Sequence, residues 1–98
     1  MAEKLLADDI AQLEKTLGPD WQLTDGRYLT FRAKCAGFAP AQQLANLAAF
    51  VSEHLNHHAD ISFGWGYVTL RITTHDVGGL SQLDFDFANR FDAARADQ

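Results

Sequence analysis

The chain has 98 residues, of which 47% are hydrophobic and 21% charged, and its formal net charge is -5 at pH 7. This length and composition predict a single globular domain over residues 1–98 and exclude a disordered chain. The negative charge argues against direct binding to nucleic acid, which needs a basic surface, and no apolar run approaches the roughly 20 residues of a membrane span.

The first third of the chain predicts a helix followed by a β-hairpin. Apolar residues recur at helical spacing at Leu6, Ile10, Leu13 and Leu17. Gly18-Pro19 ends this helix, and Trp21–Leu23 is short and strand-like. Asp25-Gly26 favours a two-residue type I′ hairpin turn, because both positions tolerate positive φ. The returning strand has one apolar face, made of Leu29, Phe31, Ala33 and Cys35.

A second helix is expected after Gly37–Pro40, with Pro40 in its first turn and its end near Asn56. Its apolar stripe consists of Leu44, Leu47, Ala48, Val51 and Leu55. Ile61–Phe63 then predicts a short strand, and Gly64–Gly66 a tight connection. The strand that follows alternates between polar side chains and the apolar Val68, Leu70 and Ile72.

A capping box at Ser81–Asp84 predicts the start of a third helix, with Leu80 and Phe85 as a hydrophobic staple. Its apolar face continues through Leu83, Phe87 and Phe91, and residues 93–98 are expected to fray. The element order α-β-β-α-β-β-α predicts an α+β fold. We expect a four-stranded antiparallel sheet with three helices packed on one face.

Three of the four histidines lie at the end of the second helix, where imidazole side chains can move protons near neutral pH. His57 and His58 are adjacent, so one ring can accept a proton while the other donates. Glu53 precedes His57 by four residues and would orient its ring if the last helical turn persists. The alternative is that these histidines only cap the helix carbonyls.

A zinc site made of His54, His58 and His75 is a weaker interpretation, because no HExxH signature is present. We therefore expect no metal and interpret His54 as a solvated helix residue. His75 follows the end of a strand, beside a glycine-containing loop. Such positions are equally common in functional sites and on ordinary protein surface. Trp65, between two glycines, is either a flat wall for a ligand ring or a plug over the core.

Two strand faces, one carrying Tyr28, Thr30 and Arg32 and the other Tyr67, Thr69 and Arg71, are either open sheet or the contact surface of a partner. Asp84 has a structural explanation as a capping residue, and a capping carboxylate can also face a pocket.

The spacing of the candidate residues resembles that of the pterin-4a-carbinolamine dehydratases. The matching positions are Glu53, His57, His58, Trp65, His75 and Asp84, and the segment from Thr73 to Ser81, TTHDVGGLS, resembles the family's TTH…GGL[ST] segment. The resemblance covers nearly the whole chain. Ala59 stands where the family usually has proline, Asn56 where relatives often have Asp, and Gly64–Gly66 where they have a tyrosine-bearing loop.

The resemblance implies dehydration of 4a-hydroxytetrahydropterin to quinonoid dihydropterin and water. This reaction supports tetrahydrobiopterin recycling for aromatic amino-acid hydroxylases, and it needs no metal or organic cofactor. His57 and His58 would act as acid and base, and His75 would position the pterin and assist proton transfer. The residues implied to bind or hold the substrate are Glu53, Ala59, Thr74, Asp76 and Asp84.

Two alternative functions remain open at this point. The first is a non-catalytic binding or assembly module, as in relatives that act as protein-binding coactivators, and the second is a metal-dependent hydrolase. We expect a homodimer or homotetramer, because a small domain can bury an edge strand or helix face against a copy of itself. Cys35 is the only cysteine, which is compatible with the reducing cytoplasm.

Overall fold

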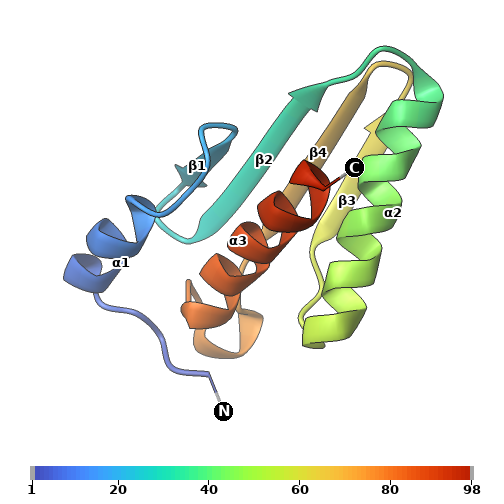
Figure 1. The fold of residues 1–98 in the computed structure, drawn as a ribbon. Coiled ribbons are helices and arrows are strands. Elements are labelled where there is room, and N and C mark those ends of the chain that lie inside the picture. Colours follow the sequence, from blue (N-terminus) through green and yellow to red (C-terminus); the bar gives the residue numbers. More distant parts are fainter. Residues whose placement is uncertain (1, 98) are drawn as a thin grey trace.

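The computed structural model describes residues 2–97. Its elements follow the predicted order, with a short 3-10 helix, η1, before the last helix. Their bounds are α1 (Ala7–Glu14), β1 (Trp21–Thr24), β2 (Tyr28–Lys34), α2 (Phe38–Leu55), β3 (Asp60–Gly64), β4 (Tyr67–Ile72), η1 (His75–Val77) and α3 (Gln82–Ala96). The strands form one antiparallel sheet in the order β1-β2-β4-β3 (Figure 1), so the predicted α+β fold is confirmed.

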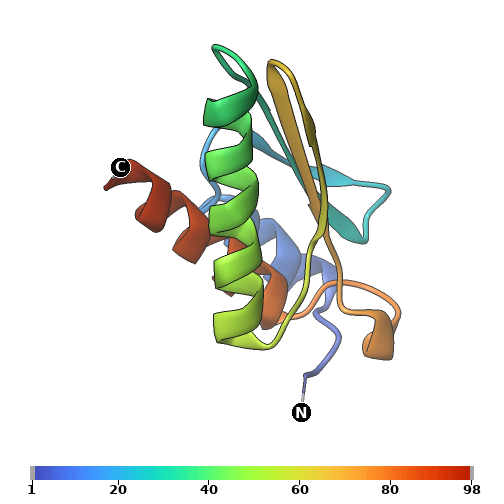
Figure 2. The ribbon, with the colours of Figure 1, turned by 90° about the vertical axis from the view of Figure 1, so that its right-hand side faces the viewer.

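The helices lie on one side of the sheet, as Figure 2 shows. α2 packs on β3 and β4, and α3 packs between α2 and β2. α1 lies next to β1 and places Ile10 and Leu13 against the core. Leu17 packs there too but follows the end of the helix, and Leu6, predicted on the same apolar stripe, precedes the helix and is exposed. The opposite face of the sheet is uncovered and presents Arg32, Tyr67 and Arg71. Within residues 2–97, no helix combines the length and apolar character that crossing a bilayer requires.

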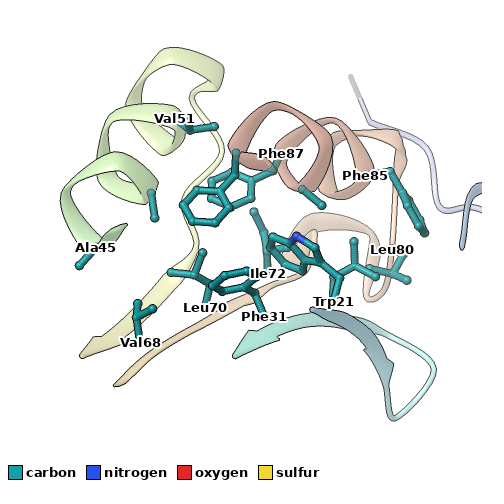
Figure 3. Packing of buried hydrophobic residues seen from close by; sticks show 14 residues of the cluster. Trp21, Phe31, Ala45, Val51, Val68, Leu70, Ile72, Leu80, Phe85 and Phe87 are labelled. Atoms are coloured by element: carbon teal, nitrogen blue, oxygen red, sulfur yellow. The ribbon is translucent and has the colours of Figure 1, made fainter. Parts of the chain in front are cut away.

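Aromatic rings fill the core between α3 and the sheet (Figure 3). Trp21 and Phe31 pack with Phe87 and Phe91, with ring centroids 5.1 to 6.4 Å apart. The indole N–H of Trp21 donates to Asp92 Oδ1 at 3.1 Å, so the buried ring keeps a hydrogen-bond partner. The inward-facing strand residues are buried as predicted, namely Leu29, Phe31, Val68, Leu70 and Ile72.

The buried face of α2 differs from the predicted stripe. Small side chains make up most of it, and the buried residues are Ala41, Ala45, Ala48, Val51 and Ser52. Leu44, Leu47 and Leu55 are only half-buried. Alanines facing the sheet let the helix backbone approach closely, whereas the larger leucines fill the flanks. Periodicity identified the helix but not the exact rotation about its axis.

The β1–β2 turn has the predicted backbone geometry, with φ of 55° at Asp25 and 70° at Gly26. Arg27 N–H donates to the carbonyl of Thr24 at 3.1 Å, which closes the turn. Strand pairing then begins with Thr24 opposite Tyr28, so the loop is one residue longer than predicted. Arg27 is therefore left outside the strand ladder.

The expectation that residues 93–98 fray is wrong for most of this segment, because α3 continues to Ala96. Arg95 explains the difference. Its guanidinium donates to Asp92 at 3.1 Å and to Asp20 at 3.0 Å, and it lies 4.7 Å from the ring centroid of Phe31. These contacts come from distant parts of the chain, so helix periodicity could not indicate them. Gln98 lies outside the described residues.

Candidate active site

The end of α2 determines where the two adjacent histidines point. Asn56 adopts a left-handed conformation, with φ of 50°, and its N–H donates to the carbonyl of Glu53 at 3.2 Å. His57 N–H donates to the carbonyl of Ser52 at 3.0 Å. This pair of hydrogen bonds is the Schellman arrangement that closes a helix end. The helix therefore stops at Leu55, and His57 and His58 leave it in different directions.

Because the last helical turn does not persist, Glu53 pairs with a different ring from the one that its spacing suggested. Its carboxylate contacts Nε2 of His58, not His57. Both partners are largely exposed, with 56% of the His58 side chain and 79% of the Glu53 side chain accessible. An exposed pair of this kind orients a ring but adds little to folding stability.

His57 is instead held by a buried carboxylate. Its Nε2 lies 2.7 Å from Oδ1 of Asp84, whose side chain is fully buried at the start of α3. Oδ2 of Asp84 accepts the Thr74 hydroxyl at 2.8 Å and the Ser81 N–H at 2.8 Å. The second contact belongs to the capping box, which is present as predicted. Asp84 therefore both caps α3 and anchors His57.

The donors in this network are fixed by counting hydrogens. Thr74 has one hydroxyl hydrogen, which goes to Asp84, so the Ser81 hydroxyl donates to Thr74 Oγ1 at 2.7 Å. We assign the hydrogen between His57 and Asp84 to His57 Nε2, because an ionised carboxylate only accepts hydrogen bonds. In the neutral ring, Nδ1 of His57 then carries the lone pair and is free to accept a proton.

A pocket of about 240 Å³ brings together the three histidines expected at the site, and its lining residues are Asn56, His57, His58, Thr73, Thr74, His75 and Asp76. Glu53 and Asp84 are not part of this lining and contact the rings of His58 and His57. Asn56 and Thr73 were not predicted as site residues. Thr73 belongs to the quoted TTH segment, whereas no sequence signal places Asn56 in the wall.

Two backbone donors expected near the substrate already have partners. Ala59 N–H donates to the hydroxyl of Ser52 at 3.2 Å, and Thr74 N–H donates to the carbonyl of Gly79 at 3.0 Å. Ala59 itself is half-buried and packs against the core. These hydrogen bonds shape the two segments that carry the histidines.

Trp65 does not join this pocket. It lies in the β3–β4 turn, and the strand β3, about 16 Å long, lies between it and the histidine pair. Its side chain is 76% exposed, so it is neither a wall of the site nor a plug over the core. His54 is exposed, as predicted, and its ring stacks on Phe50. In residues 2–97 no group of three histidine, cysteine or acidic side chains is arranged to hold a metal ion.

A family model described as pterin 4 alpha carbinolamine dehydratase matches residues 3–94. The chain belongs to this family. A relative from Paracoccus denitrificans, provisionally named pterin-4-alpha-carbinolamine dehydratase, is 46% identical over 77 residues, covering 78% of this chain and 72% of the relative. A relative with the same provisional name from Prochlorococcus marinus is 35% identical over 96 residues, covering 97% of this chain and 98% of the relative.

A solved structure shares the pterin dehydratase fold. It is a protein from Brucella melitensis described as a transcriptional coactivator/pterin dehydratase, and it superimposes with a TM-score of 0.83 at 27% sequence identity. The match covers 93% of this chain and 97% of that protein. The family resemblance inferred from the histidine spacing is therefore confirmed over nearly the whole chain.

Proposed function

We propose that this protein removes water from 4a-hydroxytetrahydropterin, giving quinonoid dihydropterin, by acid–base catalysis at His57 and His58. The observation that carries the proposal is the pocket in which three histidines meet, one of them anchored by buried Asp84. Family membership and the names of the relatives support the dehydratase reaction.

The reaction requires two proton movements. The C4a–O bond breaks as the hydroxyl takes up a proton and leaves as water, and the electrons of the N5–H bond form the new C4a=N5 double bond. We assign the base to His57, because its Nδ1 lone pair is free and Asp84 stabilises the imidazolium that forms. His58, oriented by Glu53, would supply the proton to the leaving hydroxyl.

The other implied residues take supporting roles in this proposal. His75 lies on the pocket wall, where it would position the ring and assist proton transfer. Asp76 and the Thr74 segment would bind the polar edge of the pterin, and Ala59 would lie below it. Because the N–H groups of Ala59 and Thr74 already have partners, side chains and carbonyls would make most of these contacts.

The proposal places the enzyme in tetrahydrobiopterin recycling for aromatic amino-acid hydroxylases and uses no metal or organic cofactor. We also propose that residues 1–98 act as one domain in a reducing cytoplasm, where the half-buried Cys35 stays a thiol. The test measures how fast the purified protein dehydrates 4a-hydroxytetrahydropterin. His57→Ala and His58→Ala should each lower catalysis about 100-fold, the lower end of a general acid–base contribution.

His54→Ala is the matched control, because it removes an exposed histidine of α2 that lies outside the pocket. Equal activity of all three variants and the wild type would contradict the assignment of His57 and His58.

A second candidate function is a non-catalytic binding or assembly module. The coactivator in the description of the Brucella melitensis protein favours it, as does an exposed aromatic patch at the end of the molecule opposite the histidines. The patch consists of Phe38 and Phe63, whose ring centroids lie 5.5 Å apart, and Trp65 of the adjoining β3–β4 turn, and these side chains are 37 to 76% exposed. Pterin binding without turnover, with partner capture that survives loss of His57 and His58, would favour this function over the dehydratase.

We also propose that the protein forms a homodimer or homotetramer. β3 is an edge strand, and the aromatic patch adjoins it, so a homodimer or homotetramer would cover surface that is exposed in one chain. Light scattering after size exclusion should give the mass of two or four chains for the wild type. Trp65→Ser should shift the mass toward one chain if the patch is the interface, and a wild-type monomer would contradict the oligomer.

A further inference from the structure

A smaller second pocket adjoins the histidine pocket. Its volume is about 100 Å³, and its lining residues are Arg27, Tyr28, Thr73, His75, Gly78 and Gly79. Thr73 and His75 line both pockets, so the two pockets lie next to each other with these side chains as a shared wall. The Thr73 hydroxyl also donates to the carbonyl of Arg27 at 2.6 Å. This hydrogen bond ties the β1–β2 turn to the strand end that precedes His75.

The turn places cationic side chains at this second pocket. Arg27, outside the strand ladder, donates from Nη2 to the hydroxyl of Tyr28 at 3.3 Å. The guanidinium of Arg71 lies 3.6 Å from the centroid of the Tyr28 ring, and that of Arg27 lies 5.4 Å from it. Two guanidinium groups therefore converge on one tyrosine, and of the two arginines only Arg27 lines the pocket.

These two arginines have no carboxylate partner in the described part of the chain. The arginine ion pairs in residues 2–97 are those of Arg95 with Asp20 and Asp92. Arg32 and Arg90 also lack an ion pair among the described residues, so what distinguishes Arg27 and Arg71 is that both lie against the ring of Tyr28. Asp76, the acidic residue of the histidine pocket, does not line the second pocket. Asp60 stands opposite Arg71 in the β3–β4 register, so the charge that complements an anion in this pocket is carried mainly by Arg27.

We propose that the second pocket binds an anionic group, a carboxylate or phosphate, carried by the substituent on the pterin ring. The inference rests on the proposed function, because the ring must occupy the histidine pocket for its substituent to reach past His75. The larger pocket suits a bicyclic ring, and the smaller one suits a single charged group. Arg27 and the Tyr28 hydroxyl would bind the oxygens of that group, and Arg71 would add charge.

The test compares two dihydropterin probes that differ only by phosphate. One carries a trihydroxypropyl substituent at ring position 6, and the other is phosphorylated on the terminal hydroxyl. The wild type should bind the phosphorylated probe about tenfold more tightly, the effect of one additional charge-assisted contact. Arg27→Ala combined with Arg71→Ala should reduce this ratio to about one, and Arg27→Lys should retain part of it.

Arg90→Ala is the control for net charge, because Arg90 is an exposed residue of α3 outside both pockets, and it should keep the wild-type ratio. Inorganic phosphate distinguishes a tethered from a free anion. It should weaken binding of the phosphorylated probe without displacing the neutral probe.

Equal affinity of the wild type for the two probes, or a ratio unchanged by loss of both arginines, would overturn this inference alone. Failure of the wild type to bind either probe would contradict the proposed function and, with it, the substituent pocket. Phosphate binding at Arg27 with no preference between the two probes would identify a free-anion site and would also overturn the inference.

Discussion

Ser52 and Ala59 are joined by a hydrogen bond in which the Ala59 N–H donates to the Ser52 hydroxyl at 3.2 Å. The carbonyl of the same buried serine accepts the His57 N–H at 3.0 Å. One residue of α2 therefore holds the chain on both sides of the histidine pair. Ala59 stands where the family usually has proline, and proline could not donate this bond. In this chain a hydrogen bond fixes the turn that the proline ring stiffens in relatives.

Because of this contact, we expect proline at position 59 to have different effects on stability in two backgrounds. In the wild type, Ala59→Pro removes the donor and leaves the buried Ser52 hydroxyl without it, so the free energy of unfolding should fall by about 1 kcal/mol. In a Ser52→Ala background the bond is already absent, so the same proline should cost less or stabilise the turn. Urea unfolding of the four proteins measures the coupling, and strictly additive effects would show that the bond contributes nothing.

Substitution of Asp84 should lower stability and activity more than loss of a helix cap alone would. Asp84→Asn keeps the shape but cannot accept hydrogen bonds from His57, Thr74 and Ser81 together, so stability should fall by about 2 kcal/mol and dehydration should slow. Asp86→Asn, an exposed change in the same helix, is the control. Unfolding and turnover that match this control would contradict the proposed anchor.

The tautomer of His57 is a separate prediction. With Nε2 donating to Asp84, nitrogen NMR should report a protonated Nε2 and an unprotonated Nδ1 in the neutral ring. Asp84→Asn should disturb this pattern, because the amide can also donate to the ring. A wild-type ring protonated on Nδ1 would contradict the assignment of His57 as the base.

Glu53 should behave differently from Asp84, since its contact with His58 is exposed. Glu53→Gln should leave the unfolding free energy nearly unchanged while lowering dehydration, with the wild-type rate more sensitive to added salt than that of the variant. Comparison of the two rates across salt concentrations is the measurement. A large loss of stability with full activity would assign Glu53 to the fold and not to the site.

The element order and the inward strand faces could be predicted because periodicity and turn residues report them directly. The contact between His57 and Asp84 could not, since it joins residues 27 apart in the chain through the end of one helix and the start of another. Spacing along the chain also misled for Glu53: it suggested His57 as the partner, but the helix ends before Asn56 and Glu53 contacts His58 instead. Trp65 fits the family spacing yet lies beyond the far end of β3, because a spacing pattern contains no information on direction in space.

The rate at which wild-type protein removes 4a-hydroxytetrahydropterin, compared with the spontaneous rate in the same buffer, tests the central claim most directly. We predict a faster loss of substrate that increases in proportion to protein concentration and falls toward the spontaneous rate in His57→Ala. A rate that wild-type protein leaves unchanged, although the protein is folded and pure, would contradict dehydration at the three-histidine pocket.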